Sequence, residues 1–242
     1  MPNNVSFEKI ALSPLEVKKI IEGRELLERF QATKTKIAIQ KDGALTDIAR
    51  KIILDAYDIE VPKSPKGRFS VEVSDDGETG FVYARNKSIC NLVAEGAVDM
   101  AVVGTDRLIE DEAENRVAII NSYQDSYSWS LVLATPALLS VSDPREISRV
   151  ATQYPLITKR YFESMGQFEV EVEATVGGTE LYPYLRYGER QIDAVVDLVA
   201  TGESLAAHDL VPWTPAIGEV YPVLIQRQPT FNEEEIRNAN SR

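Results

Sequence analysis

An acidic strand that runs into a glycine turn is the strongest chemical signal in the chain. Residues 192–205 read I-D-A-V-V-D-L-V-A-T-G-E-S-L, an apolar run that carries Asp193 and Asp197 and then turns into a helix. The first N–H groups of a helix have no intrahelical acceptor, so this turn presents amides that suit a phosphate, and Gly202 permits close approach. The two carboxylates share one face of the strand, where they could bind ribose hydroxyls or Mg²⁺. An ordinary turn before a helix has the same composition, so residue pattern alone leaves both interpretations open.

Two further turns follow predicted strands at their carboxyl ends. The sequence Q-K-D-G-A at 40–44 places Lys41 where it can meet a phosphate, since ligands of open α/β sheets gather outside the carboxyl ends of the strands. The sequence G-T-D at 104–106 ends in Asp106, which either caps the next helix or faces a cleft. A plain turn also explains Gly43, and capping is the commoner role for Asp106.

The chain has a single cysteine, Cys90, and a single histidine, His208. These counts exclude intrachain disulfides, Cys/His zinc sites and most hydrolase triads. Cys90 lies among the apolar positions of a predicted helix, which indicates a buried, inert thiol. We interpret His208 as structural, and Lys159 and Arg160 as solvated charges.

Composition excludes several classes of protein. The 242 residues are 44% hydrophobic and 26% charged, which is typical of a folded protein rather than a disordered one. The formal net charge of −12 argues against nucleic-acid binding. The sequence has neither a membrane span nor a secretory signal, so we expect a cytoplasmic protein with no membrane contact. An anionic ligand must then be bound locally, by amides, a few basic side chains or a divalent cation.

Short strands alternate with helical segments from residue 35 onward, which predicts an α/β fold with a mostly parallel sheet. We divide the chain into an extension, 1–34; lobe I, 35–127, completed by 219–242; and lobe II, 128–218. A ligand cleft is expected between the lobes. The predicted strands are 36–40, 69–73, 81–84, 98–103, 116–123, 128–134, 149–152, 168–173, 192–198 and 219–226; the predicted helices are 45–57, 87–95, 154–165, 176–184, 203–208 and 232–240.

The extension contains an amphipathic helix. Ser13 is the expected N-cap, Pro14 the first helical residue and Glu16 the partner that closes a capping box. Packing of this helix on its own domain is the simpler expectation, and docking onto another subunit is the alternative. Its apolar stripe is formed by Leu15, Val17, Ile20, Ile21, Leu27 and Phe30.

Five motifs in this order resemble the catalytic subunit of ATP phosphoribosyltransferases, over about residues 35–237. The resemblance is to the short form, which lacks the family's C-terminal regulatory domain. The motifs are K-I-A-I-Q-K-D-G-A-L (36–45), E-G-A-V-D-M-A-V-V-G-T-D (95–106), V-A-T-Q-Y-P-L-I-T-K-R-Y-F (150–162), G-G-T-E-L-Y-P (177–183) and the segment 192–205.

The resemblance implies a two-lobed fold of the periplasmic-binding-protein type (type II). It implies a Mg²⁺-dependent reaction in which N1 of the adenine of ATP displaces pyrophosphate from C1 of phosphoribosyl pyrophosphate, the first step of histidine biosynthesis. It further implies a homo-oligomer, either a dimer or part of a hetero-octamer with a regulatory subunit related to histidyl-tRNA synthetase.

The resemblance also implies roles for individual residues. Asp193 and Asp197 would hold the ribose and Mg²⁺, and with Lys41 they form the expected catalytic set. The turn 200–204 would hold the 5′-phosphate, whereas Gly43 and Asp106 would line the ATP side. The expected substrate-binding residues are Gly43, Arg85, Asp106, Glu180, Ala200, Thr201, Gly202, Glu203 and Ser204.

The chain departs from the family pattern at sites where relatives carry cations. Ala44 replaces an arginine, Trp129 and Ser130 replace a Cys-Arg pair, and Glu203 adds a carboxylate to the phosphate turn. A lost charge-assisted contact is worth roughly 1.5–3 kcal/mol. The candidates to replace the lost cations are Arg85, Arg107, Arg186 and Arg190.

These departures leave two alternatives to the transferase. One is a two-lobed binding or regulatory protein that kept the phosphate cradle and lost turnover. The other is a transferase that uses a base other than adenine, because the departures fall mainly on the ATP side.

Overall fold

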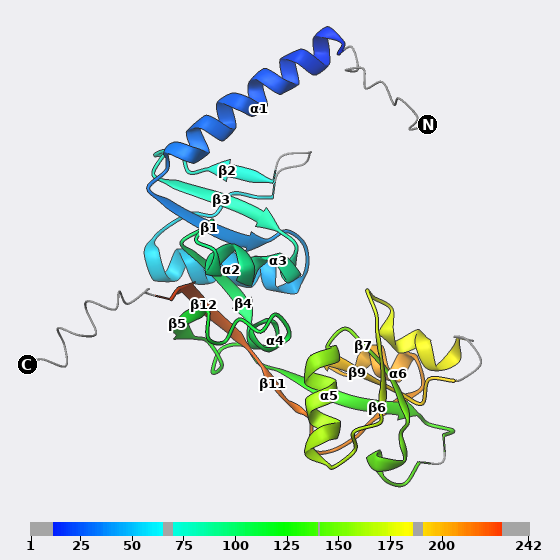
Figure 1. The fold of residues 1–242 in the computed structure, drawn as a ribbon. Coiled ribbons are helices and arrows are strands. Elements are labelled where there is room, and N and C mark those ends of the chain that lie inside the picture. Colours follow the sequence, from blue (N-terminus) through cyan, green and yellow to red (C-terminus); the bar gives the residue numbers. More distant parts are fainter. Residues whose placement is uncertain (1–11, 65–69, 140, 186–190, 229–242) are drawn as a thin grey trace, which may run out of the picture.

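The computed structural model describes residues 12–64, 70–139, 141–185 and 191–228, which form two α/β lobes and a projecting helix (Figure 1). The predicted helix 232–240 lies outside the described residues. Among the described residues, every helix is too short or too polar to cross a lipid bilayer.

Lobe I is a six-stranded mixed sheet with helices on both faces. In sheet order its strands are β2 (Val71–Val73), β3 (Thr79–Ala84), β1 (Thr35–Gln40), β4 (Met100–Gly104), β12 (Pro222–Arg227) and β5 (Val117–Ser122); its helices are α2 (Ala44–Tyr57), α3 (Asn86–Ala94) and α4 (Thr105–Glu110). Among the described strands of this sheet, only the neighbours β3–β1 and β1–β4 pair in parallel, so the expected parallel pairing holds for the centre of the sheet alone.

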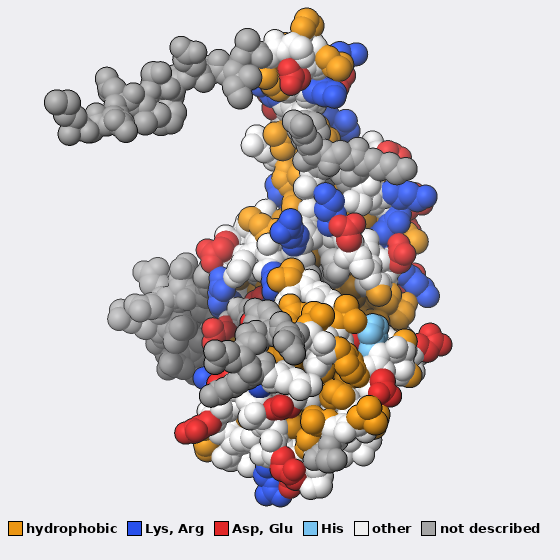
Figure 2. Space-filling view, turned by 90° about the vertical axis from the view of Figure 1, so that its right-hand side faces the viewer, with side chains coloured by type: hydrophobic (Ala, Val, Ile, Leu, Met, Phe, Trp, Pro, Cys, Tyr) orange, Lys and Arg blue, Asp and Glu red, His pale blue; other side chains and the backbone are white. Residues whose placement is uncertain are grey.

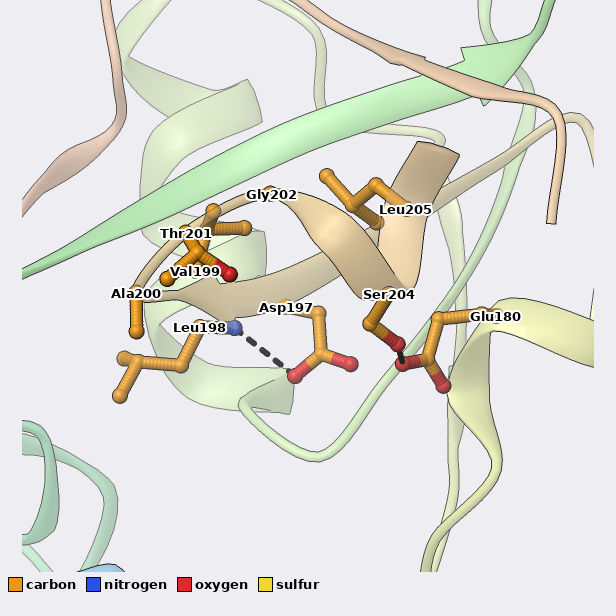
Figure 3. Close-up of a pocket in the computed structure, with 9 residues that line it drawn as sticks. All are labelled: Glu180, Asp197, Leu198, Val199, Ala200, Thr201, Gly202, Ser204 and Leu205. Carbon is orange, nitrogen blue, oxygen red and sulfur yellow. Dashed lines mark hydrogen bonds between the residues drawn. The ribbon is translucent and has the colours of Figure 1, made fainter. Parts of the chain in front are cut away.

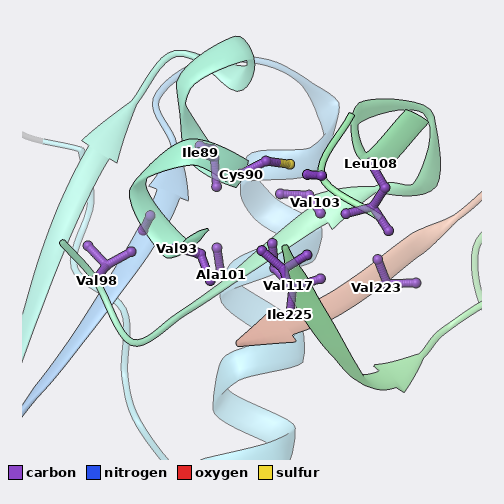
Figure 4. Close-up of a cluster of buried hydrophobic side chains, with 12 residues drawn as sticks. Ile89, Cys90, Val93, Val98, Ala101, Val103, Leu108, Val117, Val223 and Ile225 are labelled. Atoms are coloured by element: carbon purple, nitrogen blue, oxygen red, sulfur yellow. The ribbon is translucent and has the colours of Figure 1, made fainter. Parts of the chain in front are cut away.

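The alternation of side chains along β1 builds two cores. Ile37 and Ile39 pack under α2, while Ala38 faces the opposite side and packs under α3. Cys90 lies in the second of these cores and is fully buried (Figure 4). Its predicted burial is confirmed, and burial raises the pKa of its thiol to about 12.

Lobe II repeats the plan with a smaller parallel centre. In sheet order its strands are β10 (Leu210–Pro212), β6 (Trp129–Pro136), β9 (Ala194–Val199), β7 (Arg149–Thr152) and β8 (Glu171–Ala174), and β11 (Gly218–Val220) pairs with the start of β6; its helices are η1 (Pro144–Glu146), α5 (Pro155–Ser164), η2 (Thr179–Tyr184) and α6 (Glu203–Ala207). β7, β8 and β9 are parallel, whereas β6 runs antiparallel to β9. Phe162 of α5 and Leu205 of α6 fill the cores on the two faces.

The chain crosses between the lobes twice. It passes from β5 to β6 and returns from β11 to β12. The prediction of one strand over 219–226 is therefore wrong, because β11 belongs to the sheet of lobe II and β12 to the sheet of lobe I. Tyr221 lies between them, where its N–H donates to the Thr105 hydroxyl (3.3 Å) and its carbonyl accepts from the Thr105 N–H (3.0 Å).

The N-terminal helix α1 (Pro14–Ala32) has the expected start and an unexpected environment. The capping box is confirmed, since the Ser13 hydroxyl accepts from the Glu16 N–H and the Glu16 carboxylate accepts from the Ser13 N–H. The expectation that the helix packs on its own domain is wrong for most of its length, because the stripe from Leu15 to Leu27 is solvent-exposed.

Helix α4 follows the G-T-D turn and seats an acid at the edge of the lobe I sheet; its N-cap is Gly104 with no side-chain cap, so the capping role expected for Asp106 is wrong. Asp106 lies in its first turn and is only 6% exposed. Burial raises the pKa of the Asp106 carboxyl to about 6, although the positive charge of Arg107 opposes the shift. Asp106 is therefore a group whose ionised form the fold disfavours.

This burial predicts a pH-dependent effect of Asp106→Asn. Below about pH 4 the carboxyl is protonated in the folded and unfolded chains, whereas above about pH 6 it is ionised in both, which costs the folded protein about 3 kcal/mol. The free energy of unfolding of the variant should thus gain about 3 kcal/mol relative to the original chain between pH 4 and pH 7. Urea denaturation at a series of pH values measures it, and a constant difference would contradict the assignment.

Candidate functional site

Strand register brings the carboxyl edges of both parallel centres to the crossing point. In lobe II, Val199 at the end of β9 lies opposite Ser130 at the start of β6, next to the crossing from lobe I. In lobe I, Gly104 at the end of β4 lies opposite Pro222 at the start of β12, next to the return crossing. The turns that follow β4 and β9 therefore approach each other at the junction of the lobes.

A pocket of about 220 Å³ lies at the end of β9 (Figure 3). The strand supplies its floor, the turn into α6 one wall, and η2 another. Of the nine residues that line it, two are acidic and none is basic. The lining residues are Glu180, Asp197, Leu198, Val199, Ala200, Thr201, Gly202, Ser204 and Leu205.

Asp197 is the partly buried acid of the pocket. Its carboxylate accepts a hydrogen bond from the N–H of Leu198 (2.8 Å). Burial raises the pKa of Asp197 to about 6, and the negative charge of Glu180 raises it further, which indicates that the two carboxylates share the pocket.

The turn from β9 into α6 contains a left-handed glycine. Gly202 adopts a left-handed conformation (φ 79°) as the N-cap of α6, and the Thr201 hydroxyl accepts weakly from the N–H of Glu203 (3.4 Å). The Ser204 hydroxyl donates a short hydrogen bond to Glu180, and this bond lowers the pKa of Glu180. Glu203 is exposed and is absent from the pocket lining, so its carboxylate is not one of the acids of the pocket.

Asp193 does not belong to this site, which corrects the expected pair of acids. It precedes β9 at the opposite end of the strand from the turn, and four residues of strand span about 13 Å. Its carboxylate accepts from the N–H and hydroxyl of Ser148 (2.9 and 2.8 Å) and from the N–H of Arg149 (3.0 Å). One Mg²⁺, whose ligands lie about 2 Å away, cannot bind both Asp193 and Asp197.

The expected residues of lobe I gather at the facing edge. The N–H of Lys41 donates to the Ala84 carbonyl (2.9 Å), so Lys41 and the exposed Arg85 follow neighbouring strands. Gly43 has a positive φ of 116°, a conformation that favours glycine. A Cβ there would fall 2.6 Å from the side-chain amide nitrogen of Gln40.

Of the four candidate replacements for the missing arginines, Arg85 and Arg107 fall within the described residues, and these two differ in exposure. Arg85 is exposed at the edge of lobe I. Arg107 is 6% exposed and forms a short buried ion pair with Asp111, so it is not available to a ligand. Arg186 and Arg190 lie outside the described residues.

Two residues that the sequence analysis did not assign connect the lobes. The Glu110 carboxylate of α4 accepts from the N–H groups of Leu156 (3.2 Å) and Ile157 (2.7 Å), and thus caps α5 from the other lobe. Tyr154 lies between the lobes, since burial and the charges of Asp106 and Asp197 all raise the pKa of its hydroxyl. The proline of T-Q-Y-P was the signal for this helix start, but capping from a distant segment has no local signal.

The cations of that motif are solvated, as expected. Lys159 pairs with Glu163 on its own helix (3.8 Å), and Arg160 pairs with Glu114 of lobe I (3.8 Å). Within the described part of the chain, no cluster of three or more His, Cys, Asp or Glu side chains could hold a metal ion.

Solved structures share this fold. An ATP phosphoribosyl transferase (HisG:HisZ) complex from Thermotoga maritima superposes with a TM-score of 0.63 at 21% identity, covering 86% of this chain and 94% of that one. Arginine-bound Tv2483 gives a TM-score of 0.54 at 13% identity over 89% and 88% of the two chains. The AvGluR1 ligand-binding domain with glutamate gives 0.52 at 11% identity over 86% and 88%. The two-lobed fold of ligand-binding proteins is therefore confirmed.

Sequence relatives are more specific. ATP phosphoribosyltransferases of Metallosphaera sedula and Methanocaldococcus jannaschii are 30% and 29% identical over 208 and 176 residues, which cover 85% and 72% of this chain. The matches span 69% of the Metallosphaera sedula protein and 58% of the Methanocaldococcus jannaschii protein. This chain therefore matches little more than half of the length of the second relative. The sequence profile of the HisG family, described as ATP phosphoribosyltransferase, matches residues 85–242. Since that match covers more than half of the chain, the chain belongs to the HisG family of ATP phosphoribosyltransferases.

Proposed function

We propose that the protein is an ATP phosphoribosyltransferase catalytic subunit. It condenses ATP with phosphoribosyl pyrophosphate to N1-(5-phosphoribosyl)-ATP and pyrophosphate, the first step of histidine biosynthesis. The observation that carries the proposal is the Thr201–Ser204 turn, which lines one pocket with Asp197 at the junction of the lobes, inside the segment that matches the family.

The turn and Asp197 suit phosphoribosyl pyrophosphate. The first N–H groups of α6 lack intrahelical acceptors and are the proposed donors to the 5′-phosphate, with the Thr201 hydroxyl beside them. Asp197, at the end of β9, is the proposed acceptor for ribose hydroxyls. Amides bind a phosphate without adding a side-chain cation, which fits a pocket whose described lining has none.

The facing edge of lobe I suits ATP. Lys41 and Arg85 follow neighbouring parallel strands there, and we assign them to the polyphosphate. Asp106 and Gly43 lie on the same edge, at the starts of α4 and α2. Burial first, and then the charges of Asp106 and Asp197, raise the pKa of Tyr154, so we assign its neutral phenol as a hydrogen-bond donor at the junction.

The donor set of the pocket fits Mg²⁺. Glu180 from η2 and Asp197 from β9 both line the pocket with carboxylates, and Mg²⁺ in proteins is held by one or two carboxylates together with substrate phosphates. When bound there, Mg²⁺ would neutralise charge on the pyrophosphate leaving group. The protein's own residues supply positioning: the turn fixes the ribose phosphate, and the lobe I edge aims the adenine N1 at ribose C1.

We also propose a regulatory partner. The Thermotoga maritima neighbour is a HisG:HisZ complex, which supports a separate regulatory subunit for this chain, of the kind related to histidyl-tRNA synthetase. The proposal includes a homo-oligomer of catalytic subunits, within a dimer or a hetero-octamer, that works in the cytoplasm.

Turnover tests the proposal directly. The protein, with ATP, phosphoribosyl pyrophosphate and Mg²⁺, should release pyrophosphate and form an adenine nucleotide with altered ultraviolet absorbance. Asp197→Asn removes a charged acceptor, so binding of phosphoribosyl pyrophosphate should weaken roughly 10- to 100-fold, measured by calorimetry. Tight binding of both substrates without pyrophosphate release, even with the regulatory subunit, would show a binding protein instead of an enzyme.

The matched control substitution, Asp193→Asn, should affect stability rather than binding. Asp193 accepts three hydrogen bonds within the fold, so loss of its charge should lower the free energy of unfolding by about 1–3 kcal/mol. Calorimetric affinity for phosphoribosyl pyrophosphate should stay within about twofold of the original chain, a change of about 0.4 kcal/mol. A large loss of affinity without loss of stability would return Asp193 to the site.

A further inference from the structure

The Glu110 side chain makes a charged contact from one lobe to the other. Its carboxylate, on α4 of lobe I, accepts from the N–H groups of Leu156 (3.2 Å) and Ile157 (2.7 Å) in the first turn of α5 in lobe II. These N–H groups have no acceptor within their helix, and within the described part of lobe II the N-cap residue Tyr154 supplies no side-chain cap. The dipole of α5 also favours a negative charge at this end. The helix α5 is therefore capped by the other lobe.

Helix α4 holds Glu110 on a fixed base in lobe I. Residues four apart lie on the same face of a helix, so α4 has two charged faces. On one face, Arg107 and Asp111 form a buried ion pair, and Asp111 also interacts with the Cys90 thiol of α3. On the other face, Glu110 lies one turn from Asp106. Glu110 thus extends from a helix that is locked to the core of lobe I.

The start of α5 is joined to the strand that carries the pocket. The Thr152 hydroxyl, at the end of β7, donates to the Val196 carbonyl of β9 (2.8 Å) and accepts from the Tyr154 N–H (2.9 Å). Thr152 is fully buried, and Val196 directly precedes Asp197, which lines the pocket. Two hydrogen bonds therefore connect the helix that Glu110 caps to the strand end that carries Asp197.

A further contact between the lobes is open to solvent. Arg160 of α5 lies 3.8 Å from Glu114 of lobe I, and the two side chains are 48% and 50% exposed. Figure 2 shows acidic and basic side chains scattered among one another over one face of the molecule, where water and salt screen such pairs. Glu110 is half-buried and accepts two hydrogen bonds from a helix end, which makes it the stronger link.

We propose that Glu110 is a positioning residue for phosphoribosyl transfer, because its bonds to α5 set the distance between the edge of lobe I and the phosphate turn of lobe II. Its effect on the reaction rests on the proposed function, in which each lobe holds one substrate. The reacting atoms must approach to about 3–3.5 Å, which requires both lobes, whereas either substrate alone needs only one. Loss of Glu110 should slow the chemical step and leave each affinity unchanged.

Steady-state kinetics of Glu110→Ala test this expectation. The kcat should fall about 10- to 100-fold, since a misplacement of about 1 Å can cost a rate of this size. The KM and the calorimetric affinity for each substrate should stay within about twofold of the original values. Glu110→Gln keeps an acceptor oxygen at the same reach without the charge, so it should recover part of the lost kcat.

The matched control is Glu163→Ala, which removes a carboxylate from α5 itself. Glu163 pairs with Lys159 on the same helix (3.8 Å) and makes this contact within one lobe. The same substitution at this position should therefore leave kcat and the arrangement of the lobes unchanged.

Spin labels measure the arrangement of the lobes without either substrate. Because Cys90 is buried, labels can be attached to cysteines introduced at exposed positions, Lys51→Cys on α2 and Leu138→Cys in lobe II. Electron paramagnetic resonance should give one narrow distribution of distances between the labels in the original background and in Glu163→Ala. The distribution should shift or broaden in Glu110→Ala.

Three results would overturn the proposal. They are an unchanged distance distribution in Glu110→Ala, a changed distribution with an unchanged kcat, and unfolding of both Glu110 variants by circular dichroism, which would make Glu110 a structural cap only. If the original chain gives no turnover, the proposed reaction fails, and the distance measurement still decides whether Glu110 sets the arrangement of the lobes.

Discussion

The double crossing of the chain between its two sheets is the constraint on which the site depends. β6 begins in lobe II directly after the chain leaves β5, and β12 begins in lobe I directly after the chain leaves β11. Because β9 runs antiparallel to β6, and β4 antiparallel to β12, both strands must end where the chain crosses. The carboxyl edges of two separate sheets are thereby turned toward each other, and the Glu110 cap on α5 ties the same two lobes together from the side.

An acidic protein that bound the proposed anionic substrates would need a local site for them, and we assign that site to the turn after β9. Its proposed donors are backbone amides, and two acids, Asp197 and Glu180, line the same pocket. Burial disfavours the ionised form of Asp197, so a cation or a hydrogen-bond donor from the ligand would stabilise its carboxylate in place of the lost water. The proposed displacement requires no histidine base, because positioning and charge neutralisation would carry it.

Local patterns predicted much of the fold, and long-range pairing was beyond them. The capping box at Ser13 and the strand–turn–helix at 192–205 have signals within a few residues, and both are confirmed. The break between β11 and β12 at Tyr221 has no signal in the sequence. One apolar run forms both strands, and they pair with different sheets. Asp193 and Asp197 share a face by periodicity, but only the structure shows that the Asp193 carboxylate accepts hydrogen bonds from the N–H groups of Ser148 and Arg149. The apolar residues of α1 could be identified in the sequence, whereas their exposure to solvent could not be predicted from it.

The central claim is that the backbone turn between β9 and α6 binds the ribose phosphate. Amide nitrogen–proton correlation spectra of the isotope-labelled protein, recorded as phosphoribosyl pyrophosphate and Mg²⁺ are added, test it most directly. We expect large shifts for the amides of Gly202, Glu203, Ser204 and Leu205, and little change for Ser148 and Arg149, whose amides donate to Asp193. Shifts at Ser148 and Arg149 with an unchanged turn would contradict it.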